Sequence, residues 1–503
     1  MKRTRKRKTA MTEETSGAIS PLMRRLAAYI ATATRKELPP AVAEKTRHHV
    51  LDTIAAMVSG SRLLPGRMAI SYVKALGGVP EATVVGSKCV TSAVNAALAN
   101  GMLAHADETD DSHAPALMHP GCAIVSAALA TAERWRRDGA AFLRAVALGY
   151  DVAARINLSL HPVDFRRVGH LTHCFGPTFG AAAAGAALAR LDADQVRWVL
   201  SYATQQAGGL STYMRDTDHI EKAFDFGGMP ARNGVAAATM VAAGCTAVDD
   251  VFSGERNFFV AFDESGRIGK APEPGILARG LGTDYEILNT NIKRWSVGSP
   301  IQAPLDSLLE LIRVHGVKAG DVEKVTVRVS VTGANTVDNR DMPDICMQHL
   351  CAVMLTDGIV TFESAHDEKR MKDPAVLALR RRVELIGDEA LQQLLPERHG
   401  IVEIALNDGR LLRHHTRAVR GTAQNPMTHA DVDEKCYYLM APVLGKKRAR
   451  KLCDAIWNVE RVKDINGAAT IETRPGGGTV VHITLPVPAT DNSKEDVVAN
   501  SAR

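Results

Sequence analysis

The chain has 503 residues, of which 46% are apolar and 23% charged, and it carries a net charge of +5. That length exceeds what one hydrophobic core normally organises, so two or three domains are expected. Aromatic residues make up only 5% of the chain, which argues against surfaces that stack nucleic-acid bases. The longest apolar stretch, about residues 175–188, is shorter than the roughly 20 residues that cross a bilayer. Neither nucleic acid nor a membrane is therefore an expected partner.

Part of the positive charge lies at the start of the chain, in MKRTRKRK. No apolar core of the kind found in secretory signals accompanies this run, so residues 1–20 are expected to form a basic, disordered tail. The eight cysteines are scattered and form no CxxC pair, so zinc-ribbon and iron–sulfur spacings are absent. Core thiols in a reducing compartment fit this pattern, which predicts a cytoplasmic protein.

Residues 21–289 have the pattern of the first part of a helical domain. Apolar residues recur at helical spacing in PPAVAEKTRHHVLDTIAAMVSGS, as Val42, Val50, Ile54 and Met57 illustrate. The segment GPTFGAAAAGAALARL supplies Gly and Ala where two helices must approach closely, whereas the interior of a sheet uses few such residues. This region is therefore predicted to be an all-α bundle.

The pattern changes near residue 290. VEKVTVRVS alternates valine with polar residues and predicts a strand. Two strand-like runs flank Asn407, Asp408 and Gly409, which is typical of a hairpin. Helices are predicted between these strands, in PIQAPLDSLLELIRVHG, DICMQHLCAVMLTDG and DPAVLALRRRVELIG. Residues 290–430 are therefore expected to form a smaller α+β lid domain.

Residues 431–470 return to a helical pattern, and residues 471–503 are expected to hold one hairpin and a polar tail. The expected fold class is mainly α, with a large all-α helical domain into which the α+β lid domain is inserted. Because the chain would cross between the domains twice, a hinge and a cleft between them are expected.

The densest candidate chemistry lies in DETDDSHAPALMHPG, residues 107–121. Four carboxylates and two histidines crowd this stretch, and nearly pure apolar helices flank it on both sides. A metal site, an acid–base site and a solvated loop that caps the next helix are all consistent with its composition. No recurring metal-binding pattern such as HExxH is present, so no metal is expected.

Three other segments carry isolated polar residues in apolar surroundings. His170 and His173 precede a Gly-rich helix start, which suits a carboxylate because its backbone N–H groups are free. Lys222 stands among apolar residues before a Gly-Gly turn, and Lys293 and Arg294 lie at the expected domain boundary. Taken alone, each residue could equally be a packed histidine or a surface cation.

Five motifs, taken in order, resemble the MmgE/PrpD family. These motifs are NGMLAHADETDDSHAPALMHPG, GYDVAARI, GHLTHCFGPTFGAAAAGAALARLDADQ, KAFDFGGMPARNGVAAATMVAAG and NIKRWSVGSPIQAPLD. The resemblance covers about residues 21–466. It implies a helical domain with an α+β lid, a homodimer, and catalysis without a metal or organic cofactor. The family includes 2-methylcitrate dehydratase, cis-aconitate decarboxylase and iminodisuccinate epimerase.

Carried over by motif, the resemblance assigns a catalytic set and a substrate-binding set. The catalytic residues implied are His119, His170, Lys222 and Lys293. The substrate-binding positions implied are Glu108, Ser112 and His349, and Asp111 and His173, which lie close to motif positions, are also predicted to bind substrate. Glu108 stands where the family usually has Asp, His173 where it often has a small or hydroxyl residue, and His349 where the decarboxylase has Tyr.

The family's reactions break a bond at a carbon next to a carboxylate. Lys222 and Lys293, expected on opposite walls of the cleft, would clamp carboxylates and stabilise an enolate. His119 and His170 would transfer protons, because histidine titrates near neutral pH. Glu108 or Asp111 would orient His119. The neighbouring residues are expected to serve only in helix capping, loop structure and contact with solvent: Asp107, Thr109, Asp110 and His113.

The predicted function is that of a cofactor-independent lyase that acts on a small di- or tricarboxylate. Dehydration of a 2-methylcitrate-like hydroxy acid is the leading reaction. A cis-aconitate-type decarboxylase and an iminodisuccinate-type epimerase are the alternatives within the family. A carboxylate-binding member without catalytic activity is the alternative from a different class.

Overall fold

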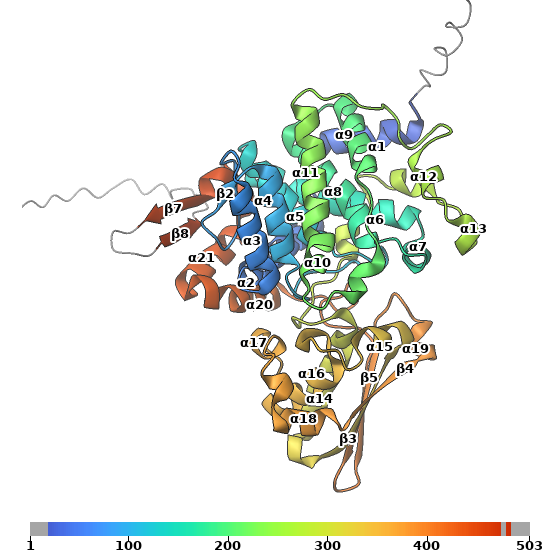
Figure 1. Cartoon of the computed structure of the whole chain (residues 1–503), viewed down its shortest axis with the longest axis vertical. Helices are drawn as coiled ribbons and strands as arrows, with labels where there is room; N and C mark the ends of the chain where they lie inside the picture. The colour runs from blue at the N-terminus through green and yellow to red at the C-terminus, as the bar shows by residue number, and fades with distance from the viewer. Residues whose placement is uncertain (1–18, 474–478, 484–503) are drawn as a thin grey trace, which may run out of the picture.

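The computed structural model describes residues 19–473 and 479–483, in which a large helical body lies against a smaller α+β lid (Figure 1). About 60% of the structure is helix and 9% is strand, so the predicted mainly-α fold is confirmed. Most of the basic tail expected at residues 1–20, and of the tail expected at 471–503, lies outside the described residues. In the described residues at the two ends, Ser20 caps the first helix, and a short hairpin that begins just before residue 471 forms from β7 (Ala469–Thr473) and β8 (Thr479–Ile483).

The body is built around α8 (Thr172–Ala189), which packs against α5 (Pro120–Arg134), α6 (Gly139–Ser159) and α11 (Met229–Ala242). The Gly and Ala residues of α8 make this close packing possible. A Cβ atom at Gly180 would overlap the carbonyl oxygen of Gly149 on α6, and one at Gly185 would crowd Ala238 on α11. The Ala/Gly-rich sequence therefore lets three helices approach one another at backbone distance.

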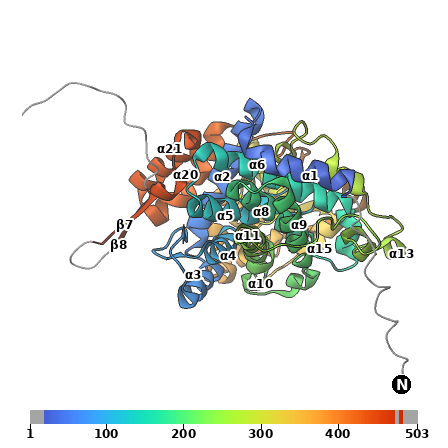
Figure 2. The same cartoon turned by 90° about the horizontal axis from the view of Figure 1, so that it is seen from above.

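Further helices surround this centre, as the view from above shows (Figure 2). They are α1 (Pro21–Thr32), α2 (Pro40–Gly60), α3 (Leu64–Leu76), α4 (Ala93–Ala104), α9 (Ala193–Gln205), α20 (His429–Leu444) and α21 (Lys446–Trp457). The last two helices come from the end of the chain and pack on α2. One hydrophobic cluster accordingly joins residues 42–292 with residues 427–465.

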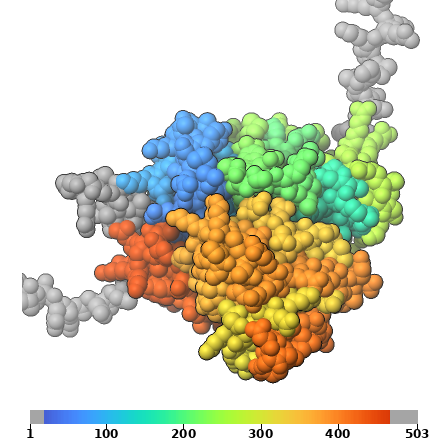
Figure 3. All heavy atoms as spheres, turned by 60° about the horizontal axis from the view of Figure 1, so that its bottom comes forward, coloured from blue at the N-terminus to red at the C-terminus, as the bar shows by residue number. Residues whose placement is uncertain are grey.

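The lid has its own hydrophobic core, formed by residues 295–412. Its four-stranded sheet has the order β4-β3-β5-β6, with β3 at Val322–Ser330, β4 at Val383–Asp388, β5 at Gly400–Leu406 and β6 at Leu411–Thr416. Strand β4 runs parallel to β3, and the other pairs are antiparallel. The main lid helices are α14 (Gln302–His315), α16 (Met347–Asp357) and α18 (Pro374–Arg380). Figure 3 shows that the lid covers one side of the body.

The lid corrects one sequence prediction. The helix expected over DPAVLALRRRVELIG ends at Arg380, and Val383–Asp388 form strand β4 instead. Residues Val383 to Asp388 pair in register with Val325 to Ser330 of β3. Pairing with a strand more than fifty residues earlier decides this conformation, because strand preference depends on neighbours more than on local sequence.

A π-helical turn at Phe224–Gly228 joins α10 (Ile220–Ala223) to α11 and positions the side chains at the domain boundary. Gly227 of this turn meets Gly101 of α4 so closely that a Cβ atom on either residue would overlap the other's carbonyl oxygen. Single π-helical turns of this kind are common at functional sites. The contact brings Lys222 and Phe226 next to the loop that follows α4.

No helix in residues 19–473 and 479–483 combines the length and the apolar character that crossing a membrane requires. The eight cysteines are all free thiols, and six of them are buried.

Candidate active site at the domain boundary

The acidic loop between α4 and α5 is buried, which corrects the expectation that part of it faces solvent. Glu108 is 5% exposed, and Asp110 and Asp111 are fully buried. The loop is held to the crossing between the domains, where Ser112 and Asn291 exchange two backbone hydrogen bonds of 2.9 and 2.8 Å. Buried carboxylates require hydrogen-bond or ionic partners, and these partners define the site.

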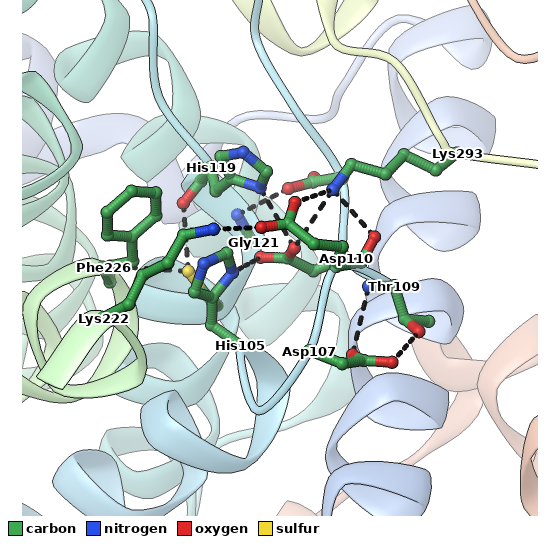
Figure 4. A network of polar contacts seen from close by, with 12 residues as sticks. His105, Asp107, Thr109, Asp110, His119, Gly121, Lys222, Phe226 and Lys293 are labelled. Carbon is green, nitrogen blue, oxygen red and sulfur yellow. Dashed lines mark hydrogen bonds and ion pairs between the residues drawn. The ribbon is translucent and has the colours of Figure 1, made fainter. Parts of the chain in front are cut away.

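Asp110 bridges two imidazole rings (Figure 4). Its carboxylate oxygens lie 2.9 Å from Nδ1 of His105 and 3.0 Å from Nδ1 of His119. Burial alone would raise the pKa of Asp110, but the two imidazoles hold that pKa well below its usual range. An ionised Asp110 accepts a hydrogen bond from the Nδ1–H group of His119, so Nε2 of that ring carries no hydrogen and keeps its lone pair. Burial lowers the pKa of His119 below 6.5 despite Asp110, which keeps the ring neutral at neutral pH.

Lys222 and Lys293 approach the site from opposite sides (Figure 4), and both form ion pairs with Glu108. Lys293 Nζ is 3.0 Å from one carboxylate oxygen of Glu108 and 2.8 Å from its backbone carbonyl oxygen, and Lys222 binds the other carboxylate oxygen. Burial opposes ionisation of Glu108, but Lys222 and Lys293 hold its pKa well below the usual range. Burial would lower the pKa of Lys222, whereas Glu108 raises it. Both groups are therefore charged at neutral pH.

The structure brings His173, and not His170, to this site. The His173 ring stacks on Phe226 with a centroid distance of 3.9 Å and lies 5.3 Å from the ring of His119. His170 instead binds Glu264 at 2.8 Å through Nε2 and stacks on Phe165. Its ring contacts are all outside the cluster around His119.

Three buried ring nitrogens of this cluster have no hydrogen-bond partner among the residues that the structure describes. They are Nε2 of His105, Nδ1 of His173 and Nε2 of His219. The ring of His219 lies 5.3 Å from that of His105, which in turn lies 4.9 Å from that of His119. Buried polar atoms without protein partners are rare, and a ligand oxygen or an ordered water normally satisfies them. The cluster therefore offers polar atoms to a bound molecule.

Asp111 does not contact His119. Its carboxylate accepts hydrogen bonds from Tyr150 Oη at 2.6 Å and from the Gly121 backbone N–H at 2.9 Å, and it pairs with His49 Nδ1 at 2.7 Å. These contacts cap α5 and fasten the loop to the body. Asp110, and neither Glu108 nor Asp111, hydrogen-bonds His119, although sequence reasoning assigned Asp110 to loop structure.

A cavity of about 370 Å³ opens between the body and the lid beside this cluster. Ser112 and Lys293 line it from the body side, and Arg398 and Arg417 line it from the lid. His349 does not line this cavity. It is buried in α16, where the charged groups that affect its pKa, Arg380 first among them, belong to the lid itself.

Among the residues that the structure describes, two groups of side chains have the spacing of metal ligands, namely His105, Asp110 and His119, and His105, Glu108 and His219. The carboxylates of these groups already have partners, because Asp110 accepts hydrogen bonds from two imidazoles and Glu108 forms ion pairs with two ammonium groups. A divalent cation at Glu108 would stand beside Lys222 and Lys293 and be repelled by both. The charge distribution therefore suits an anionic ligand better than a cation.

Sequence reasoning missed His105, Asp110, His219 and Phe226 as members of this cluster. His105 and Asp110 lie in the quoted motif, and the short spacing between an acidic residue and two histidines was the available signal. His219 and Phe226 flank Lys222 in the sequence, but nothing local indicates that the α10 turn faces the loop after α4.

The fold and this cluster define a two-domain helical protein in which neutral histidines and ion-paired lysines meet beside an interdomain cavity. The MmgE/PrpD N-terminal domain model matches residues 24–269, and the MmgE/PrpD C-terminal domain model matches residues 295–460. The chain belongs to the MmgE/PrpD family, as its motifs predicted. Members of this family are typically lyases, dehydratases among them. A comparison with curated proteins finds no match.

Proposed function

We propose that the protein is a lyase that dehydrates a small hydroxy di- or tricarboxylate of the 2-methylcitrate type. The observation that carries this proposal is the pairing of His119 with Asp110, which leaves Nε2 of a neutral imidazole available beside Lys222 and Lys293. A neutral, oriented imidazole is suited to remove a proton from carbon, and nearby ammonium groups stabilise the negative charge that results.

In the proposed reaction, Nε2 of His119 removes the proton next to a substrate carboxylate. The electron pair of the C–H bond moves into that carboxylate as an enolate, and Lys293 and Lys222 stabilise the charge. The pair then forms the C=C bond as the neighbouring C–O bond breaks. The imidazolium of His119 returns its proton to the leaving oxygen, so water departs and the site is restored. Asp110 stabilises the imidazolium between these steps.

His173 has a separate role in this proposal. Burial, and after it the repulsion from His119, holds the pKa of His173 well below 6.5, so this ring stays neutral. A neutral imidazole is a poor proton donor but a good hydrogen-bond donor to a developing oxyanion. We place its unpartnered Nδ1 against a substrate oxygen, which would satisfy this buried atom.

Exchange of substrate hydrogen with solvent tests the proposal directly. The protein is incubated in D2O with citrate, 2-methylcitrate, cis-aconitate or iminodisuccinate, and the acids are followed by NMR. We expect deuterium at the carbon next to a carboxylate and loss of water from a hydroxy acid. Loss of CO2 would show that the protein is a decarboxylase and not a dehydratase. Inverted configuration at the carbon next to a carboxylate, without elimination of water, would indicate an epimerase. Absence of exchange, product and binding for all four acids would overturn the assignment as a carboxylate enzyme.

The pH dependence of turnover follows from the state of His119. Because the pKa of this base is lowered below 6.5, we expect kcat/KM to be constant at neutral pH and to fall as His119 becomes protonated in more acidic solution. A rate profile between about pH 4.5 and pH 8 measures this limb. An acidic limb centred above 6.5 would contradict His119 as the neutral base.

We also propose that the protein is a homodimer formed through α3. Leu64, Met68, Tyr72 and Leu76 recur every four residues on this helix and are 41–56% exposed, so they form one apolar stripe. An exposed apolar stripe of this length on a helix indicates a protein interface. A second copy of the chain presents the same stripe, which allows a two-fold interface.

Replacing Tyr72 by Glu tests the homodimer. We expect Tyr72→Glu to convert dimer into monomer, measured by light scattering after size-exclusion chromatography, because a charge would be buried in an apolar contact. Val314→Glu on α14 of the lid, where the valine is 55% exposed, is the matched control and should leave the dimer intact. A Tyr72→Glu variant that remains dimeric would place the interface elsewhere.

A further inference from the structure

The two active-site lysines are already matched by negative charge. Lys222 and Lys293 both bind Glu108, and Lys293 also lies 3.9 Å from an oxygen of Asp110. An ammonium group paired with a buried carboxylate can still donate a hydrogen bond to an adjacent oxyanion, but it attracts a second anion only weakly from a distance, because the pair is nearly neutral there. Binding of a polycarboxylate therefore requires positive charge beyond that of the two lysines.

Arg398 supplies such a charge from the lid. It precedes β5 and lines the interdomain cavity together with Ser112 and Lys293. Its guanidinium makes no hydrogen bond or ion pair with any residue in the ranges 19–473 and 479–483, although the side chain is partly buried. Burial, followed by the repulsion of Arg166, lowers the pKa of Arg398 to about 10. The guanidinium is thus charged and partly desolvated. Glu108 attracts it, but no carboxylate in the described part of the chain forms an ion pair with it.

Arg166 supplies a second unmatched charge from the body. It lies in the last turn of α7 (Pro162–Arg167) and donates a hydrogen bond of 2.6 Å to Tyr213 Oη. The Tyr213 ring lies 6.3 Å from His173 and 4.8 Å from Phe226, so Arg166 flanks the histidine cluster. Among the described residues, Arg166 has no carboxylate partner. Two guanidinium groups from different domains therefore flank the active-site cluster, Arg398 from the cavity that Lys293 also lines and Arg166 from beside Tyr213.

The other charged lid side chains that line the cavity differ from Arg398. Arg420 is paired with Asp431, and Glu397 lies 3.3 Å from His399. Arg417 also lines the cavity, but its side chain is exposed to solvent, which weakens its attraction for an anion. Arg166 and Arg398 are thus the cations whose unpaired charge a bound anion would neutralise most effectively.

We propose that Arg166 and Arg398 form a carboxylate clamp across the two domains, which binds a substrate carboxylate remote from His119. The clamp rests on the proposed function, because the carboxylate that it would bind belongs to the same substrate from which His119 removes a proton. Guanidinium groups fit carboxylates through paired hydrogen bonds, which lysine cannot provide. A substrate that reaches both His119 and the clamp must carry at least two carboxylates. Monocarboxylates should therefore be excluded by loss of binding, before any chemistry.

Binding of tricarballylate, measured by calorimetry, tests the clamp without turnover. This tricarboxylate has no hydroxyl group and cannot be dehydrated. We expect Arg398→Gln and Arg166→Gln each to weaken its binding by about 10- to 100-fold, the usual effect of losing a charge-assisted hydrogen bond. Binding of propionate, a monocarboxylate, should be weak in the wild-type protein and unchanged in both variants.

Matched variants separate the clamp from general electrostatics and from misfolding. Arg417→Gln removes another cation that lines the same cavity and should change tricarballylate binding less than twofold. Arg398→Lys and Arg166→Lys keep the charge, preserve the fold and should recover only part of the affinity. Equal binding by wild type and both Gln variants, or an equal loss in Arg417→Gln, would overturn the clamp.

The two proposals can fail independently. If tricarballylate binding depends on Arg166 and Arg398 but no acid exchanges hydrogen in D2O, the clamp stands and the lyase assignment fails. If exchange occurs and the arginine variants bind tricarballylate normally, the lyase assignment stands and the clamp fails.

Discussion

Replacement of Asp110 by Asn is expected to lower kcat by about 10³- to 10⁴-fold, the size of the effect when the aspartate behind a catalytic histidine is made neutral. Asp110 fixes His119 with hydrogen on Nδ1 and so leaves Nε2 as the base. An Asn amide can donate to Nδ1 and favour the opposite tautomer, which would remove the base from the substrate side. The loss is measured by steady-state kinetics, with the carboxylic acid that the D2O exchange experiment identifies as the substrate.

Asp111→Asn is the matched control, because the same change is made one residue away in an equally buried carboxylate. Asp111 holds Tyr150, His49 and the Gly121 N–H, so its replacement should lower the melting temperature. Protein that remains folded should keep kcat within about tenfold, since the environment of His119 is preserved. If Asp110→Asn retained kcat while Asp111→Asn lost it, the orienting role would belong to Asp111, as the sequence interpretation allowed.

Replacement of His173 by Asn is expected to lower kcat by about 10²- to 10⁴-fold, the range for loss of a group that acts on the transition state. Its ring stacks on Phe226 beside His119, and its Nδ1 has no partner in the described residues. The effect should fall on kcat more than on KM, because the hydrogen bond strengthens as charge develops on the substrate oxygen.

His170→Asn provides the comparison within the same motif. His170 contacts Glu264 and Phe165, and its partly exposed ring lies outside the cluster around His119. We expect a modest loss of stability with kcat changed by less than about tenfold. Loss of turnover in His170→Asn, with normal turnover in His173→Asn, would restore the catalytic role that the motif comparison implied for His170.

Local sequence patterns located the regular elements of the fold well. Strand β3 spans Val322–Ser330, which is the stretch VEKVTVRVS predicted from its alternation, and the hairpin of β5 and β6 turns at Gly409 with a φ of 87°. Strand β4 was missed because its pairing with β3 is a long-range contact that outweighs the helical pattern of the preceding residues. The periodicity of apolar residues indicates which residues share a face of one helix or strand, but it does not indicate which other element that segment pairs with.

The candidate site was predicted only in part. His119, Lys222, Lys293 and Glu108 were singled out, and the structure brings them together. Asp110 was set aside in favour of Asp111, because adjacent carboxylates in a loop cannot be told apart by residue type. The resemblance assigned His170 to catalysis and His173 to substrate binding, but only His173 lies near His119, because it is in the first turn of α8 whereas His170 precedes that helix.

The sequence by itself determined the family, the mainly helical architecture and the chemical types available, because these follow from periodicity, from Gly and Ala spacing and from motifs that are continuous in the chain. Tertiary structure decided which carboxylate orients which histidine, and that both lysines share Glu108. It also placed Arg398 on the interdomain cavity and Arg166 beside Tyr213, next to the histidine cluster, each without an ion-pair partner in the described part of the chain. Hydrogen bonds and charge balance depend on distances between separate elements, and such distances exist only once the helices and the lid have packed.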